Sequence, residues 1–160
     1  MTDIAEHFIA KSRSYLCASY MPKLERCLEA LTDEDVWWRA NDESNSIGNL
    51  LLHIDGSTRM WIITGAGNAP NVRQRQQEFD ERKVISRAEL LARLRATVAE
   101  ADGVLASLRS ETLMALRQVG EVKLTVLAAI FHAVEHFSMH TGQVIMLTKL
   151  RTGKDLSLSD

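Results

Sequence analysis

The chain has few of the residues that build disulfide scaffolds or thiolate metal sites. Its 160 residues include two cysteines and no Cys-x-x-Cys pair, so thiolate zinc sites and thioredoxin-like chemistry have no support. If Cys17 and Cys27 share one helix, they lie about 15 Å apart along its axis, which is too far for a disulfide. We therefore expect both thiols to be free.

Excess positive charge and long apolar runs are also missing. The formal net charge is −2, which argues against nucleic acid as the main partner, because phosphate binding depends on surplus Lys and Arg. No apolar run reaches the roughly 18–20 residues of a membrane span, and the first residues lack the basic and apolar regions of a signal peptide. We expect one domain, residues 1–160, in a reducing cytoplasm.

No segment predicts a β-strand, a repeat or a low-complexity region, whereas apolar positions recur at helical spacing along most of the chain. A short capped helix is expected at 32–38, where Thr32 precedes three acidic residues. The long helices are expected at about Asp3 to Leu31, Ile47 to Thr64, Ser86 to Arg109 and Leu124 to Arg151. These lengths predict an all-α fold, a four-helix bundle with a short extra helix.

Glycine and proline set the helix boundaries. Pro22 should kink or restart the first helix, and the Gly65–Pro70 cluster should end the second. A polar connection of about twenty residues follows, long enough to be a functional loop. Gly120 marks another break. The charged stretch from Arg73 to Arg95 mixes both signs, and we expect it to be a solvated face.

Three histidines stand four residues apart in the last expected helix: His132, His136 and His140. Each four-residue step turns a side chain by about 40°, so the three imidazoles share one stripe, and Gln143 falls in the same arc. The surrounding helix is apolar nearly all round. Unpaired buried imidazole costs about 1–3 kcal/mol per group, so the stripe must face either a metal ion or a hydrogen-bonded core.

His53 lies among apolar residues in the second expected helix. An i, i+4 histidine pair on one helix and a single histidine on another can present three nitrogens to one ion. Such a set leaves coordination positions open for water or substrate, which is typical of a catalytic site. The His132-x-x-Glu135-His136 spacing also matches an inverted zinc-peptidase motif, but the chain has no room for that larger catalytic domain.

Other candidates have weaker support. Asp55 and Arg59 form an i, i+4 pair that favours surface or rim electrostatics over catalysis. The three tryptophans, Trp37, Trp38 and Trp61, are more typical of core or interface packing than of a substrate cage.

Two segments carry a resemblance to a known family. Asn45-Ser46-Ile47-Gly48-Asn49-Leu50-Leu51-Leu52-His53 and Val134 to Ile145, with its His-x-x-x-His-x-Gly-Gln run, resemble the DinB-like (YfiT-like) superfamily of metal-dependent four-helix bundles. The stretches from Leu31 to Arg39 and from Arg73 to Phe79 are similar to an uncharacterised subfamily of that group. The resemblance covers essentially the whole chain.

The resemblance implies a metal site and a homodimer. It implies His53, His136 and His140 as ligands of a divalent ion, and the all-nitrogen donor set suits zinc or nickel better than magnesium. Three roles remain open for His132: it could contact the ligands without binding the metal, contact the substrate, or serve as an alternative ligand. Gln143 is expected to orient a ligand imidazole or a metal-bound water.

Characterised branches of the superfamily transfer or isomerise with low-molecular-weight thiols such as bacillithiol, mycothiol or glutathione. The first functional hypothesis is therefore a metal-dependent small-molecule enzyme, such as a thiol S-transferase with no nucleic-acid or membrane partner. The second is a non-catalytic, metal-dependent ligand-binding or stress-response protein. In the third, the histidines form a hydrogen-bonded core without metal.

Overall fold

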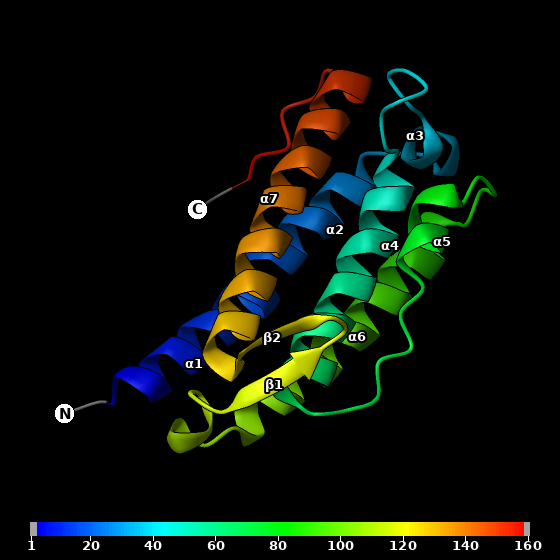
Figure 1. The fold of residues 1–160 in the computed structure, drawn as a ribbon. Coiled ribbons are helices and arrows are strands. Elements are labelled where there is room, and N and C mark those ends of the chain that lie inside the picture. Colours follow the sequence, from blue (N-terminus) through cyan, green and yellow to red (C-terminus); the bar gives the residue numbers. More distant parts are fainter. Residues whose placement is uncertain (1–2, 159–160) are drawn as a thin grey trace.

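Four long helical arms pack side by side in the computed structural model, which describes residues 3–158 (Figure 1). The first arm contacts the last, the last contacts the second, and the second contacts the third, which closes back on the first. The helices are α1 (Ile4–Ser14), α2 (Met21–Glu29), α3 (Asp33–Trp37), α4 (Ile47–Thr58), α5 (Arg75–Asp80), α6 (Arg87–Ser107) and α7 (Val126–Thr152). The predicted four-helix bundle and its short extra helix are confirmed.

The first arm runs through α1, a π-helical segment at Tyr15–Tyr20, and α2. Pro22 lies at the start of α2 and has no backbone N–H for the helical ladder. Just before it, the Met21 N–H donates to the Leu16 carbonyl, five residues back. The wider turn therefore lets the arm continue past Pro22, which restarts the helix as predicted. Cys17 and Cys27 are both free thiols, as expected.

Helix α4 is the central element, because every one of its twelve residues is buried. It packs against α6 on one side and α7 on the other, and α5 covers a further face. A π-helical segment, Arg59–Ala66, continues the arm to the breaker cluster that was predicted to end it. The hydrogen-bond partner of a polar side chain on α4 must therefore lie inside the protein.

The sequence interpretation missed a β-hairpin. β1 (Leu116–Val119) and β2 (Val122–Thr125) pair antiparallel in front of the bundle (Figure 1). Gly120 adopts a φ of +60° in the connecting turn, a conformation that suits a two-residue hairpin loop. The break predicted at Gly120 is thus a hairpin turn. The helix expected to start at about Leu124 begins two residues later, because Thr125 is the N-cap and α7 starts at Val126.

The connection between α4 and α6 is not a plain loop, because it holds α5. Two side chains tie it to the bundle: Asn49 Nδ2 donates to the Glu78 carbonyl at 2.9 Å, and Trp37 Nε1 donates to the Ile85 carbonyl at 2.8 Å. These bonds hold the segment against α4 and α3. Side chains of the connection can therefore contact the polar side chains on that face of α4.

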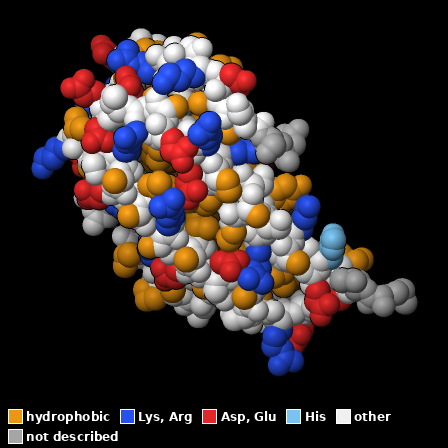
Figure 2. All heavy atoms as spheres, turned by 180° about the vertical axis from the view of Figure 1, so that it is seen from behind, with side chains coloured by type: hydrophobic (Ala, Val, Ile, Leu, Met, Phe, Trp, Pro, Cys, Tyr) orange, Lys and Arg blue, Asp and Glu red, His pale blue; other side chains and the backbone are white. Residues whose placement is uncertain are grey.

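The rear face of the molecule carries charges of both signs. Figure 2 shows acidic and basic side chains interspersed among apolar ones, with no large patch of one sign. Ion pairs join helices across the bundle, among them Arg13–Asp102 between α1 and α6 and Arg95–Glu25 between α6 and α2. Among the described residues, no helix combines the length and the apolar character that crossing a membrane requires.

Candidate metal centre

One stripe of α4 carries the site. Ser46 caps the helix by accepting the Asn49 N–H, and the Asn49 side chain holds the backbone of the α5 segment. His53 follows one turn later and Gly56 almost one turn after that, so these residues point the same way. The stripe therefore brings His53 to the place where α4, α5 and α7 meet.

The structure brings His53, His136 and His140 together. His136 Nε2 lies 3.0 Å from His53 Nε2 and 3.1 Å from His140 Nε2, and one ligand atom from each residue falls within 4.8 Å of the others. Tetrahedral zinc with Zn–N bonds of 2.0–2.1 Å places its nitrogens about 3.3 Å apart. Two of the three nitrogen–nitrogen separations are therefore close to the spacing that a single ion requires, and all three ligand atoms lie within 4.8 Å of one another.

The Nδ1 atoms of two of these rings have hydrogen-bond partners outside the cluster. His53 Nδ1 lies 2.8 Å from Glu78 Oε2, and His140 Nδ1 lies 2.6 Å from Gln143 Oε1. A carboxylate and an amide oxygen only accept hydrogen bonds, which favours the proton on both Nδ1 atoms. Arg73 Nη2, which only donates, also lies 3.1 Å from His53 Nδ1. The Nε2 atoms of His53 and His140 consequently present lone pairs toward His136.

With these tautomers, a metal-free hydrogen-bonded core would leave one of the two lone pairs without a proton of its own. A neutral His136 has one proton to offer through Nε2, and two lone pairs compete for it. Burial, followed by the neighbouring His140 and His53, lowers the pKa of His136 to about 3, so protonation at neutral pH is disfavoured. Three neutral nitrogens around one point are the donor set of a zinc-type ion, and the residues present fit such a group.

Glu78 belongs to a buried ion pair. Arg73 Nε lies 2.7 Å from Glu78 Oε1, and Arg73 Nη2 lies 2.8 Å from Oε2, in a fork that uses both oxygens. Both side chains are less than a tenth exposed. Burial raises the pKa of the Glu78 carboxyl, but the hydrogen bonds from Arg73 and His53 outweigh it and leave that pKa below its usual value.

The expectation that the charged stretch from Arg73 to Arg95 is a solvated face is therefore wrong for Arg73 and Glu78. Much of the remainder is exposed. The pair faces inward because α4 offers it both a partner, His53, and a gap at Gly56. Composition alone does not distinguish these two charges from their exposed neighbours.

The expected surface role of Asp55 was also wrong, because its side chain is buried. Asp55 Oδ2 accepts from Arg93 Nε at 2.9 Å, and Oδ1 accepts from the Thr97 hydroxyl, while Arg59 stays at 4.0 Å. Asp55 therefore links α4 to α6 on the side away from α7. It takes no part in the histidine cluster.

His132 lies one turn before the cluster and is half-buried. Its ring packs edge-on against Trp61, with centroids 4.6 Å apart, and its centroid is 5.5 Å from that of His136. It is not among the nitrogens that converge. Trp61 and Trp37 pack against the core, and Trp38 lies beneath the Arg151 guanidinium.

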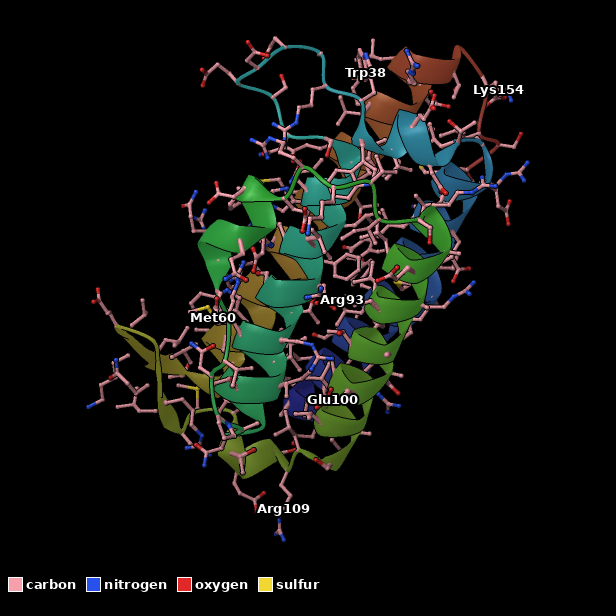
Figure 3. The ribbon with its side chains drawn as sticks, turned by 90° about the vertical axis from the view of Figure 1, so that its right-hand side faces the viewer. Trp38, Met60, Arg93, Glu100, Arg109 and Lys154 are labelled. Atoms are coloured by element: carbon pink, nitrogen blue, oxygen red, sulfur yellow. The ribbon has the colours of Figure 1, made fainter. Side chains whose placement is uncertain are left out.

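A cavity of about 330 Å³ lies beside the cluster, on the α6 side of the Arg73–Glu78 pair. Arg93 reaches from α6 toward α4 at its edge, and Met60 lies toward the hairpin (Figure 3). None of the three clustered histidines lines it. The pair thus forms a wall between this cavity and the histidines.

The fold is that of DinB-like proteins. A DinB-like protein from Bacillus cereus ATCC 10987 superposes with a TM-score of 0.72 at 16% identity, with 95% of each chain covered. A conserved protein from Enterococcus faecalis gives a TM-score of 0.74 at 16% identity, covering 96% of this chain and all of that one. The expected superfamily resemblance is confirmed at the level of the fold.

Residues 3–159 match the model of a protein family described as "Protein of unknown function (DUF1572)". The chain belongs to this family, and its fold is shared with DinB-like proteins. No curated protein matches the sequence.

The sequence interpretation missed Glu78 and Arg73 as part of the site. A signal was present, since the stretch from Arg73 to Phe79 was among those resembling the family. Glycine inside an apolar helix also often marks close packing. What the sequence did not show is that this stretch folds back onto the His53 face.

Proposed function

We propose that the protein binds one divalent metal ion through His53, His136 and His140. The observation that carries the proposal is the convergence of three Nε2 atoms, two of which are oriented by hydrogen bonds at Nδ1. The carboxylate-free donor set favours zinc or nickel over magnesium. When bound, such an ion supplies a Lewis acid that lowers the pKa of a coordinated thiol or water.

We further propose that the site serves a metal-dependent small-molecule enzyme, such as a low-molecular-weight-thiol S-transferase. In that reaction a sulfur–carbon bond forms, the thiol proton passes to solvent, and the leaving group of the electrophile departs. The chain's own part is to hold three neutral imidazoles in place. Trp61 packs edge-on against the half-buried His132, one turn before the cluster, and we propose both as substrate contacts.

Substitution of one ligand tests both proposals. Wild-type protein reconstituted with zinc or nickel should hold about one equivalent after desalting, and His136→Ala should hold well below one. Turnover of a thiol with a panel of electrophiles should be lost in the same variant. Wild-type metal content near zero after reconstitution contradicts the metal site, and turnover unchanged in His136→Ala contradicts its catalytic use.

One observation favours the alternative of a non-catalytic ligand-binding protein. Glu78 is the carboxylate in contact with the cluster, and both its oxygens are engaged by Arg73 and His53. It is therefore not free to act as a general base. A binder would show saturable, metal-dependent ligand binding by calorimetry and no product with any thiol and electrophile pair.

A further inference from the structure

We infer that Glu78 positions His53 for metal binding, with Arg73 locking the carboxylate and Gly56 providing the space that it occupies. The inference rests on the proposed metal site and deepens it. It assigns the α5 connection, which contributes no ligand of its own, a direct part in building the centre.

The first step is the direction of the hydrogen bond. An ionised carboxylate only accepts, so the 2.8 Å contact between Glu78 Oε2 and His53 Nδ1 requires the proton on Nδ1. The lone pair of His53 is then on Nε2, which faces His136. A metal-ligating histidine commonly has a carboxylate or carbonyl behind it in this way. Arg73 Nη2 lies 3.1 Å from the same Nδ1 but can only donate, so among the described residues Glu78 is the acceptor that selects this tautomer.

The second step is the immobility of the carboxylate. Arg73 engages both Glu78 oxygens, and a bidentate guanidinium fixes the plane of a carboxylate as well as its charge. Asn49, one turn before His53, holds the Glu78 backbone carbonyl at 2.9 Å. The Glu78 residue is thus fixed at its main chain and its side chain by groups that leave its contact with His53 intact.

The third step is space. A Cβ built on Gly56 would overlap Glu78 Oε1 and would lie 3.0 Å from Arg73 Nε. Any larger residue would push the carboxylate off His53. The carboxylate therefore depends on a glycine three residues after the histidine, on the same face of α4.

Nuclear magnetic resonance of ¹⁵N-labelled imidazoles in the metal-free protein tests the inference without reference to activity. In the wild type, His53 should be a single Nδ1–H tautomer at neutral pH. In Glu78→Ala, which leaves Nδ1 without the acceptor at position 78, His53 should lose that single tautomer, whereas His140, which is held by Gln143, should keep its own. A wild-type His53 protonated on Nε2 overturns the inference, even if Glu78→Ala fails to fold.

Metal affinity provides the second readout. Competition with a chelator for zinc should show affinity roughly 10- to 100-fold weaker in Glu78→Gln than in the wild type. Asp80→Asn is the matched control, because it removes a carboxylate from the same short helix at a residue that is exposed. Its affinity should stay within about twofold of the wild type.

The two proposals fail in different ways. A wild-type protein that binds no metal contradicts the metal site itself. Wild type and Glu78→Gln of equal zinc affinity contradict the positioning role and leave the metal site standing. Equal losses in Glu78→Gln and Asp80→Asn also contradict it, because they would reflect the charge of α5 and not the contact with His53.

Discussion

Gly56 is the residue whose size is most restricted at the site, because the Arg73–Glu78 pair occupies the place of its missing side chain. We expect Gly56→Ala to lower the free energy of unfolding by about 3 kcal/mol, since it separates a buried pair and leaves its charges uncompensated. Urea unfolding of the metal-free protein measures this change.

Gly103 provides the control for that substitution. It lies in α6, where a methyl group added to its Cα would meet no neighbouring side chain within 4 Å, so Gly103→Ala should raise stability by about 0.5–1 kcal/mol through helix propensity. A Gly56→Ala variant that is as stable as Gly103→Ala would show that Glu78 can move aside at no cost.

At the residue scale the sequence identified the three clustered histidines, but it identified only one of the two residues that contact their Nδ1 atoms. Gln143 was found because it shares a helix with His140, and spacing on one helix can be counted. Glu78 was not found, because its contact with His53 spans 25 positions and depends on how the α5 segment folds back. Periodicity carries no information about such a contact.

At the scale of the elements, side-chain pairs join helices that sequence treats separately. Arg13 Nε and Nη2 lie 2.6 and 2.9 Å from the two oxygens of Asp102, which links α1 to α6. The hydrogen bond from Arg13 lowers the pKa of the Asp102 carboxyl below 3.8. A carboxyl group whose pKa is lower in the folded than in the unfolded protein stabilises the fold at a pH above its unfolded pKa. This stabilisation is lost as the pH falls through the pKa of the folded state.

We therefore expect Asp102→Asn to be less stable than the wild type at pH 7 by up to about 1 kcal/mol, a modest value because both side chains are partly exposed. The difference should shrink as the pH falls below about 4, where the wild-type carboxyl also becomes protonated. Denaturant titrations of both proteins from pH 7 to pH 2.5 measure it. A difference that does not vary with pH would assign the effect to packing and not to charge.

The elements differ in how well the sequence predicted them. Helices α6 and α7 and the short α3 were found close to their observed bounds, because capping residues and long apolar stripes mark them. The hairpin was missed, because four-residue strands are too short for alternation to be distinguished from a helix end. The two π-helical segments carry no pattern that separates them from α-helix.

At the scale of the molecule, the proposed ion would join α4 to α7, whose histidines are more than 80 positions apart. Metal that binds only the folded protein stabilises it by about 2.7 kcal/mol at a free concentration 100-fold above Kd. For a chain of this length we expect a rise in Tm of about 5–10 °C on adding zinc.

Thermal unfolding with and without zinc measures that shift. His136→Ala should abolish most of it, and His7→Ala should retain it, because His7 is exposed on α1 away from the cluster. A shift of equal size in both variants would place the metal elsewhere on the protein.

Local patterns determined much of this protein. They were sufficient for the all-α class, the free cysteines, the capped helix starts and the histidine stripe, since each depends on neighbours within about one or two helical turns. Tertiary structure alone decided that His53 meets His136 and His140, and that Arg73 and Glu78 turn inward over Gly56. It also turned Asp55 toward α6. These contacts depend on which faces of α4 are covered by α5, α6 and α7, and packing between distant segments, not spacing along the chain, sets that arrangement.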